Sequence, residues 1–255
     1  MSISVLRRTS ACMAVLSLAV LGSAATASAA PTITFKLKAI PIPGFPGTGD
    51  ILGAGAEIQG QGEILGTEYG GFPPPVIGLK VYAPAGAKLH PQGFATCSPS
   101  TIERDGLGPC PKKSMAGLQG SVSGVVSFGT ERVHETVSVQ PFFAPGGNVD
   151  AFVEGHTPVS LEILTTGHVI SSSPPFGLEF IGEVPLIETV PGALDASTYE
   201  GTISAGAAYK QGKKTISYIT MPKECPKGGW PAKVEISFLG GATAAASSKL
   251  PCPRR

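Results

Sequence analysis

The sequence predicts an all-β protein, an antiparallel β-sandwich of the jelly-roll or immunoglobulin-like type with about ten strands. Two observations support this class. The 255 residues include 34 Gly and 24 Pro, the two residue types that most strongly disfavour helix interiors. The longest segment after the first thirty residues that lacks both types is residues 130–140. Segments this short suit strands, and their apolar and polar side chains alternate with the period of two that a strand requires.

The clearest strand is residues 232–239, where Val234 and Ile236 alternate with Lys233 and Glu235. The same reasoning gives a strand for each of the other apolar segments between turn residues. The expected strands cover residues 32–38, 56–65, 76–82, 117–128, 130–140, 148–154, 159–170, 176–184, 199–209, 214–220 and 232–239.

Turn residues predict two hairpins and one helix. Residues 144–147 (Ala-Pro-Gly-Gly) and 211–212 (Gln-Gly) each separate two expected strands, as hairpin turns do. A single short helix is expected near Pro99, because Ser98 is a favourable N-cap, Pro99 suits the first helical position and Gly106 suits the end.

The first 29 residues have the layout of a secretory signal peptide. Arg7 and Arg8 precede an apolar run over residues 11–22, and small residues follow up to Ala29. Such a run would rise about 18 Å as a helix, against a hydrocarbon core of about 30 Å, so a membrane anchor is not expected. We therefore expect an extracellular or cell-surface protein that is exported through a cleaved signal peptide.

Residues 30–255 are expected to form a single β-sandwich domain, because no long linker divides them. The alternative is two smaller sandwiches, each with one local cysteine pair. Four cysteines remain after the signal peptide, and an even number in an exported chain indicates disulfides. They are Cys97, Cys110, Cys225 and Cys252.

Three pairings of these cysteines are open, and proximity in sequence favours Cys97 with Cys110 and Cys225 with Cys252. A zinc site would require closer pairs than the thirteen-residue separation of Cys97 and Cys110.

The search for catalytic motifs gives no assignment. The chain has no zinc-protease motif, no nucleophile elbow and no phosphate-binding loop, and we predict neither a metal nor a cofactor. Glu135 would share a strand face with Val133 and Val137, which would bury its carboxylate, unless an edge strand or a bulge turns it outward, which we favour. Glu154 and His156 would share another face, at a strand end where we expect both to be solvated.

Two aromatic residues are candidate ligand contacts. Trp230, the single tryptophan, and Tyr69 each lie in a Gly- and Pro-rich segment, where an exposed ring stacks on a sugar. For both, the interpretation that we favour is a ring that covers part of the core. For Trp230, that part is the region near Cys225.

Charge is unevenly distributed. Residues 206–255 hold nine basic and two acidic residues, whereas residues 30–205 hold eight basic and sixteen acidic ones. The lysines of the basic part would form a patch for an anionic cell-wall polymer or a glycan, unless neighbouring carboxylates cancel their charge, which is the outcome that we favour. The net charge of +1 argues against a nucleic-acid partner. The candidate lysines are Lys210, Lys213, Lys214, Lys223 and Lys227.

One set of segments is characteristic as a group: residues 66–75, 88–91, 94–99, 126–129, 142–147, 155–159 and 252–255. Together these segments resemble a family of secreted proteins from high-GC bacteria. The resemblance spans most of the chain after residue 30 and implies export, but it brings no activity and no catalytic residues. We therefore expect a secreted or cell-surface binding or structural component rather than an enzyme; the alternative is a secreted hydrolase that acts on polysaccharide.

Overall fold

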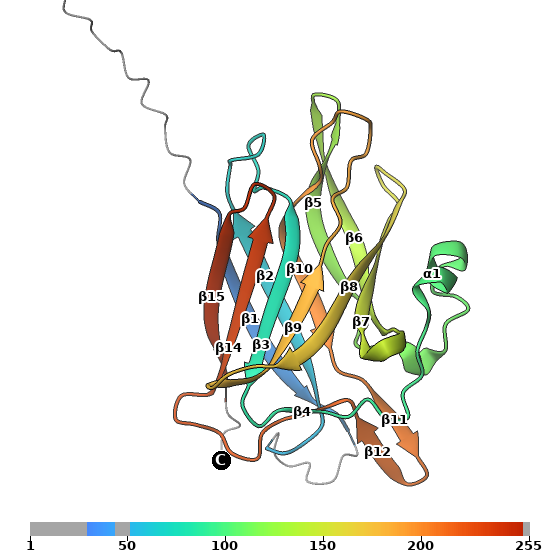
Figure 1. Ribbon diagram of the computed structural model, residues 1–255, viewed down its shortest axis with the longest axis vertical. Helices are drawn as coiled ribbons and strands as arrows, with labels where there is room; N and C mark the ends of the chain where they lie inside the picture. The colour runs from blue at the N-terminus through green and yellow to red at the C-terminus, as the bar shows by residue number, and fades with distance from the viewer. Residues whose placement is uncertain (1–29, 44–51, 252–255) are drawn as a thin grey trace, which may run out of the picture.

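The computed structural model describes residues 30–43 and 52–251. These residues form an antiparallel sheet of eleven strands, with one short α-helix beside it (Figure 1). The order of strands across the sheet is β1-β2-β10-β5-β6-β7-β8-β9-β3-β14-β15. The prediction of an antiparallel all-β protein is confirmed. In chain order, the strands are β1 (Thr32–Pro41), β2 (Ala56–Leu65), β3 (Val76–Pro84), β5 (Gly120–Phe128), β6 (Glu131–Phe143), β7 (Val149–Gly155), β8 (Leu161–Ser171), β9 (Phe176–Glu183), β10 (Ser197–Ala205), β14 (Trp230–Phe238) and β15 (Thr243–Leu250).

The sheet curls, so that strands from its two ends face each other across a core as the layers of a sandwich do. The edge strands β1 and β15 lie side by side, although they are at opposite ends of the strand order (Figure 1). Ile64 of β2 packs with Phe238 and Ile236 of β14, and Ile33 of β1 joins them. Burial of these apolar side chains is the main force that closes the sheet.

Strand β15 was not expected from the sequence. Its residues include three consecutive alanines and two serines, which have low strand propensity and no regular alternation of large apolar side chains. It pairs along its length with β14, from Trp230 opposite Leu250 to Ser237 opposite Thr243. Its small side chains suit the close approach of β1, and Ala244 is buried in the core that both strands cover.

Two expected strands are each divided in the structure. Residues 199–209 become β10 and β11 (Ala208–Gln211), and residues 214–220 become β12 (Lys214–Ser217) and β13 (Ile219–Thr220). The ribbon of β11 and β12 stands apart from the large sheet, and β13 pairs with the two-residue strand β4 (Lys88–Leu89). The two predicted hairpins are confirmed. The turn η2 (Pro145–Gly147) joins β6 to β7, and Gly212 lies in the turn between β11 and β12.

The predicted helix is α1 (Pro99–Asp105). Ser98 caps it by accepting a hydrogen bond from the Thr101 N–H (3.2 Å), and the chain leaves the helix at Gly106, where φ is +67°. Ile102 points from α1 into a cluster with Phe142 of β6 and Phe152 of β7. A 3₁₀ turn, η1 (Lys112–Ser114), follows and leads towards β5.

The expected signal peptide, residues 1–29, lies outside the described residues, and the single-domain organisation stays a prediction. Within residues 30–43 and 52–251, no helix is both long and apolar enough to cross a membrane.

Candidate binding surfaces

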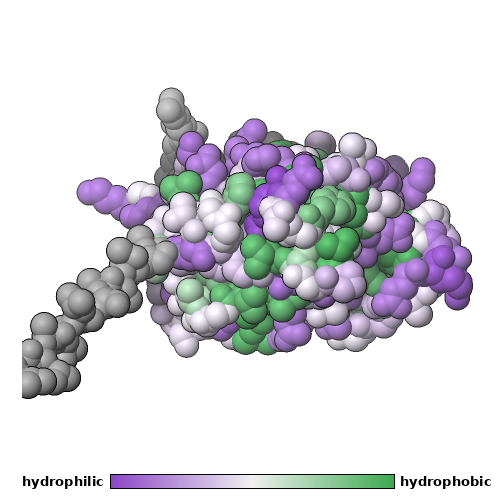
Figure 2. All heavy atoms as spheres, turned by 90° about the horizontal axis from the view of Figure 1, so that it is seen from above, coloured by the Kyte–Doolittle hydropathy of each residue, from purple (hydrophilic) through white to green (hydrophobic). Residues whose placement is uncertain are grey.

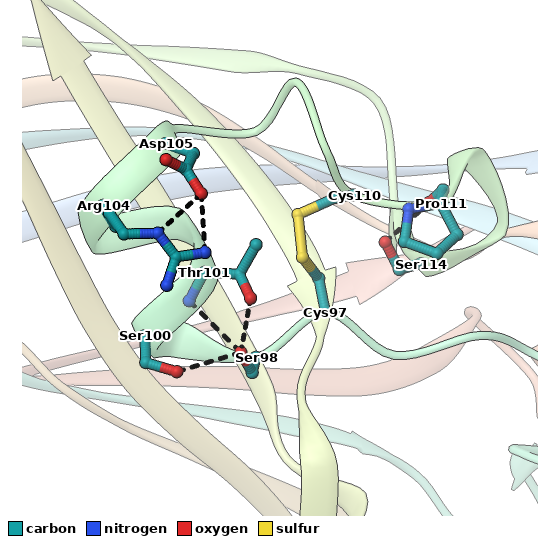
Figure 3. Close-up of a disulfide and its surroundings, with 9 residues drawn as sticks. All are labelled: Cys97, Ser98, Ser100, Thr101, Arg104, Asp105, Cys110, Pro111 and Ser114. Atoms are coloured by element: carbon teal, nitrogen blue, oxygen red, sulfur yellow. Dashed lines mark hydrogen bonds and ion pairs between the residues drawn. A yellow bond between two sulfur atoms is a disulfide. The ribbon is translucent and has the colours of Figure 1, made fainter.

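Cys97 and Cys110 form a disulfide on either side of α1 (Figure 3). The Cα atoms lie 5.4 Å apart, within the usual range for a disulfide. The bridge packs in the cluster of Ile102 and Phe142 and so fastens the helix to β6. It is one of the two disulfides that proximity in sequence favours, and its pairing is as predicted.

The other predicted pair is only partly described. Cys225 is not a free thiol and packs beside the cluster of Trp230 and Met221. Cys252 lies outside the described residues, so the pairing of Cys225 with Cys252 stays a prediction.

The indole of Trp230 lies in the core. The side chain is 1% exposed, and its Nε1–H donates to the carbonyl of Glu224 at 2.8 Å. It packs with Ala56, Met221 and Leu250. A ring buried on all sides has no face to offer a sugar, so the structure places Trp230 away from any ligand-binding surface.

Tyr69, in the loop between β2 and β3, lies beside the half-buried Arg132 of β6. The guanidinium of Arg132 packs between two rings, 5.8 Å from the centroid of Tyr69 and 5.2 Å from that of Phe72. Its Nη2 donates to the Ser197 hydroxyl at 3.0 Å, while Nε and Nη1 are buried without a partner. The Tyr69 hydroxyl accepts from the Asp195 N–H. Tyr69 therefore helps to cover Arg132.

Apolar side chains gather at the end of the molecule where this loop lies. Figure 2 shows them between hydrophilic ones when the molecule is seen from above. Leu65, the last residue of β2 before the loop, is 60% exposed. Leu194 lies next to Gly70 of the loop and is 40% exposed. Nothing in the structure indicates what would cover this surface.

Glu135 points into the protein. The residue is 5% exposed, and neither carboxylate oxygen has a hydrogen-bond partner. Burial raises the pKa of the carboxyl group; the nearby Val159 N–H opposes this in part, without hydrogen-bonding geometry. The expectation of an outward-turned Glu135 is wrong, because β6 pairs with β5 through Glu135 without a register shift and so keeps its alternation.

Gly155 provides the space for this carboxylate. A Cβ atom at Gly155 would lie 2.5 Å from Oε1 of Glu135 and 2.8 Å from Cγ1 of Val137. A larger residue on β7 would therefore displace the side chain of Glu135.

Glu154 and His156 come together on the opposite face of the sheet. The His156 Nε2 lies 3.7 Å from the Glu154 Oε1, and the two side chains are 73% and 34% exposed, respectively. They line a shallow hollow of about 440 Å³ with Thr136 and Ser138 of β6. Because Glu154 pairs with Ser138 and strand side chains alternate, Glu135 lies on the other face. The two carboxylates therefore cannot act on one bond.

His90 and His134 each lie near a single hydroxyl group. His90 Nε2 lies 3.1 Å from the Thr220 hydroxyl, and His134 Nδ1 lies 3.3 Å from the Tyr199 hydroxyl. Among the residues described, no three His, Cys, Asp or Glu side chains are grouped so that they could hold a metal ion.

Five exposed lysines gather at the ribbon of β11 and β12. We call this set the basic hairpin. The Lys113 Nζ lies 4.7 Å from the centroid of the Tyr209 ring, which brings η1 against the ribbon. The Tyr209 hydroxyl donates to the Gln92 carbonyl, and its ring packs edge-on against Phe94. The basic hairpin consists of Lys112, Lys113, Lys210, Lys213 and Lys214.

None of these five lysines has a carboxylate within 4 Å in the described part of the chain. Elsewhere the charges do cancel, as Lys80 pairs with Glu179 and Lys233 with Glu235. Two lysines of the expected patch, Lys223 and Lys227, are not part of the ribbon and lie in the segment between β13 and β14. Sequence reasoning missed Lys112 and Lys113, because the contact of Lys113 with Tyr209 joins segments that are about a hundred residues apart in the chain.

No family model, no curated protein and no solved structure matches this chain.

Proposed function

We infer that the protein is a cell-surface or secreted binding component that holds an anionic polymer through the basic hairpin. The observation that carries this proposal is the set of five exposed lysines, none of which pairs with a carboxylate among residues 30–43 and 52–251. Lysines that are not neutralised by carboxylates create a positive potential around the projecting ribbon, and this potential attracts a polyanion.

The geometry of the ribbon supports contact with an extended chain. Lys210 is opposite Thr215 and Lys214 is opposite Gln211, so the two lysines lie on different faces of the ribbon, and Lys213 lies in the turn. The anchor formed by Tyr209 fixes the ribbon against residues 92–94. A polymer that wraps the ribbon would meet charge on each side.

The test is sedimentation with isolated cell walls, together with binding of soluble poly(glycerol phosphate). We expect salt-sensitive binding, which the Lys210→Gln/Lys213→Gln/Lys214→Gln variant weakens by about 3- to 150-fold at an exposed-pair energy of about 0.2–1 kcal/mol per lysine.

The matched control is the Lys36→Gln/Lys38→Gln/Lys249→Gln variant, which loses the same charge on β1 and β15. Equal weakening in both variants, or no binding by the unmodified protein, would overturn the proposal. A neutral glycan such as dextran should not bind.

The alternative of polysaccharide hydrolysis has one supporting observation, the hollow that Glu154 and His156 line. A glycosidase requires two carboxylates that flank the bond that breaks, and Glu135 cannot be the second of them, because it lies on the other face of the sheet. Release of reducing sugar that the Glu154→Gln variant abolishes would favour hydrolysis over binding.

A further inference from the structure

A groove on the outer face of β8 combines an apolar floor with acidic sides. It has a volume of about 480 Å³ and runs between α1 and residues 185–188. We call it the acidic groove. Its floor and wall are formed by Phe152, Ile163, Leu164, Pro185, Leu186 and Ile187, and its carboxylates are those of Glu103, Glu162 and Glu188.

The apolar part of the groove is both fixed and open. Leu164 of β8 packs on the cluster of the Cys97–Cys110 disulfide, so the floor of the groove is part of a packed core. Leu186 is 47% exposed on the wall, although a leucine of a stable protein is more often buried. An apolar side chain of a ligand would find a preformed surface here.

The carboxylates of the groove have no cationic partner within the described residues. Arg104, the basic residue of α1, pairs with its neighbour Asp105 instead of Glu103 (Figure 3). Glu162 and Glu188 are absent from every ion pair, and one oxygen of Glu188 accepts from the Gly192 N–H.

A fourth carboxylate extends this negative surface. Glu154 of β7 lies directly opposite Glu162 of β8, so the hollow that Glu154 and His156 line lies next to the groove on the same face of the sheet. Like charges directly opposite each other on two strands destabilise the pairing. A cation placed between Glu154 and Glu162 would remove this repulsion, and His156 faces only the first of them.

We propose that the acidic groove binds an extended cationic peptide segment. Lysine or arginine side chains of the segment lie between Glu154 and Glu162 and beside Glu188, and an apolar side chain between them packs on Leu164 and Leu186. The charge complementarity excludes the polyanion of the basic hairpin from this surface, so the two sites are independent.

The experiment uses a fluorescein-labelled Lys-Leu-Lys-Leu-Lys peptide and the purified chain, measured by fluorescence anisotropy. We expect saturable binding that the Glu103→Gln/Glu162→Gln/Glu188→Gln variant weakens about tenfold or more. The matched control, Glu63→Gln/Glu131→Gln/Glu200→Gln, loses the same charge at exposed positions on β2, β6 and β10, away from the groove, and should bind within about twofold of the unmodified chain.

The apolar contact has its own variant. Leu186→Ser should weaken binding about tenfold, because it removes a leucine that the peptide would cover. A Lys-Ser-Lys-Ser-Lys peptide should bind correspondingly less well to the unmodified chain. Equal effects of the two Glu variants, or no effect of Leu186→Ser, would overturn the proposal.

The remaining outcome is a second copy of this chain in the groove, with its own basic hairpin as the cationic segment. Sedimentation velocity would then show self-association that Lys210→Gln/Lys213→Gln/Lys214→Gln abolishes, and the peptide proposal would be wrong. Otherwise the lysine variant should bind the peptide normally, and the Glu103→Gln/Glu162→Gln/Glu188→Gln variant should bind the polyanion at least as well as the unmodified chain.

Discussion

The buried polar groups near the two ends of strand β6 differ in whether they have hydrogen-bond partners. At the end near η2, Asp150 is 3% exposed, and its Oδ1 accepts from the Gly167 N–H at 3.0 Å. Nearby, the Gln140 amide donates to the Gly117 carbonyl, and the buried Ser114 hydroxyl donates to the Pro111 carbonyl. The disulfide-bound helix α1 covers the same end.

At the other end, several buried groups lack partners, although the buried Ser197 hydroxyl accepts from Arg132. All the buried side-chain oxygen and nitrogen atoms without a hydrogen bond, within the part of the chain that is described, belong to four residues. They lie at or near the hairpin of β5 and β6 and are Glu68, Ser127, Arg132 and Glu135. Since buried polar groups are normally paired, stability is concentrated at one end of this strand and is lower at the other.

The largest effect expected at the stable end is that of the disulfide. The Cys97→Ser/Cys110→Ser variant should lose about 3 kcal/mol in the free energy of unfolding, because the bridge closes a loop with a sequence separation of 13. Urea denaturation followed by tryptophan fluorescence measures this change. A loss below about 1 kcal/mol would mean that the packing of Ile102 alone holds α1 in place.

The partner of Asp150 provides the next comparison. Asp150→Ala should cost about 1–3 kcal/mol in the free energy of unfolding, because it leaves the buried Gly167 N–H without an acceptor. Asp150→Asn keeps an acceptor oxygen and should retain most of the stability. If both variants are equally unstable, the hydrogen bond is not what distinguishes this end of β6.

The fold class follows from local patterns, and the parts that the sequence did not reveal depend on distant contacts. Alternation in β14 and the turns at Gly146 and Gly212 act over a few residues, so they are visible in the sequence. Strand β15 lacks this signal, because its small alanines fit the surface of β1 instead of presenting large side chains.

The candidate sites were predictable only in part, for the same reason. Cys97 with Cys110 and Glu154 with His156 are near each other in sequence, and the structure brings both pairs together. The burial of Glu135 depends on the absent side chain of Gly155, twenty residues along the chain. The basic hairpin and the acidic groove are each formed by segments far apart in sequence, so a local sequence pattern cannot predict them.

Removing the unpaired charge should stabilise the weaker end of β6. We expect Glu135→Gln to raise the free energy of unfolding by about 1 kcal/mol at pH 7, because a neutral amide is less costly to bury than a carboxylate without a partner. Glu131→Gln, at an exposed position on the same strand, should change it by less than about 0.5 kcal/mol. A loss of stability in Glu135→Gln would show that the carboxylate has a stabilising contact.

The pH dependence of this gain is the smallest effect and the most specific one. Burial raises the pKa of Glu135 in the folded state above its value in the unfolded chain, about 4.3. Between these two pKa values the unfolded chain releases a proton that the folded chain keeps, so the stability of the unmodified protein falls as the pH rises. Asp150, whose pKa is also raised by burial, contributes in the same direction in both proteins.

The difference between Glu135→Gln and the unmodified protein should therefore shrink steadily as the pH is lowered from 7 to about 4, measured by urea denaturation at each pH. A difference that stays constant over this range would mean that the group has the same charge in the folded and unfolded chains, and the contrast between the two ends of β6 would then have to rest on packing alone.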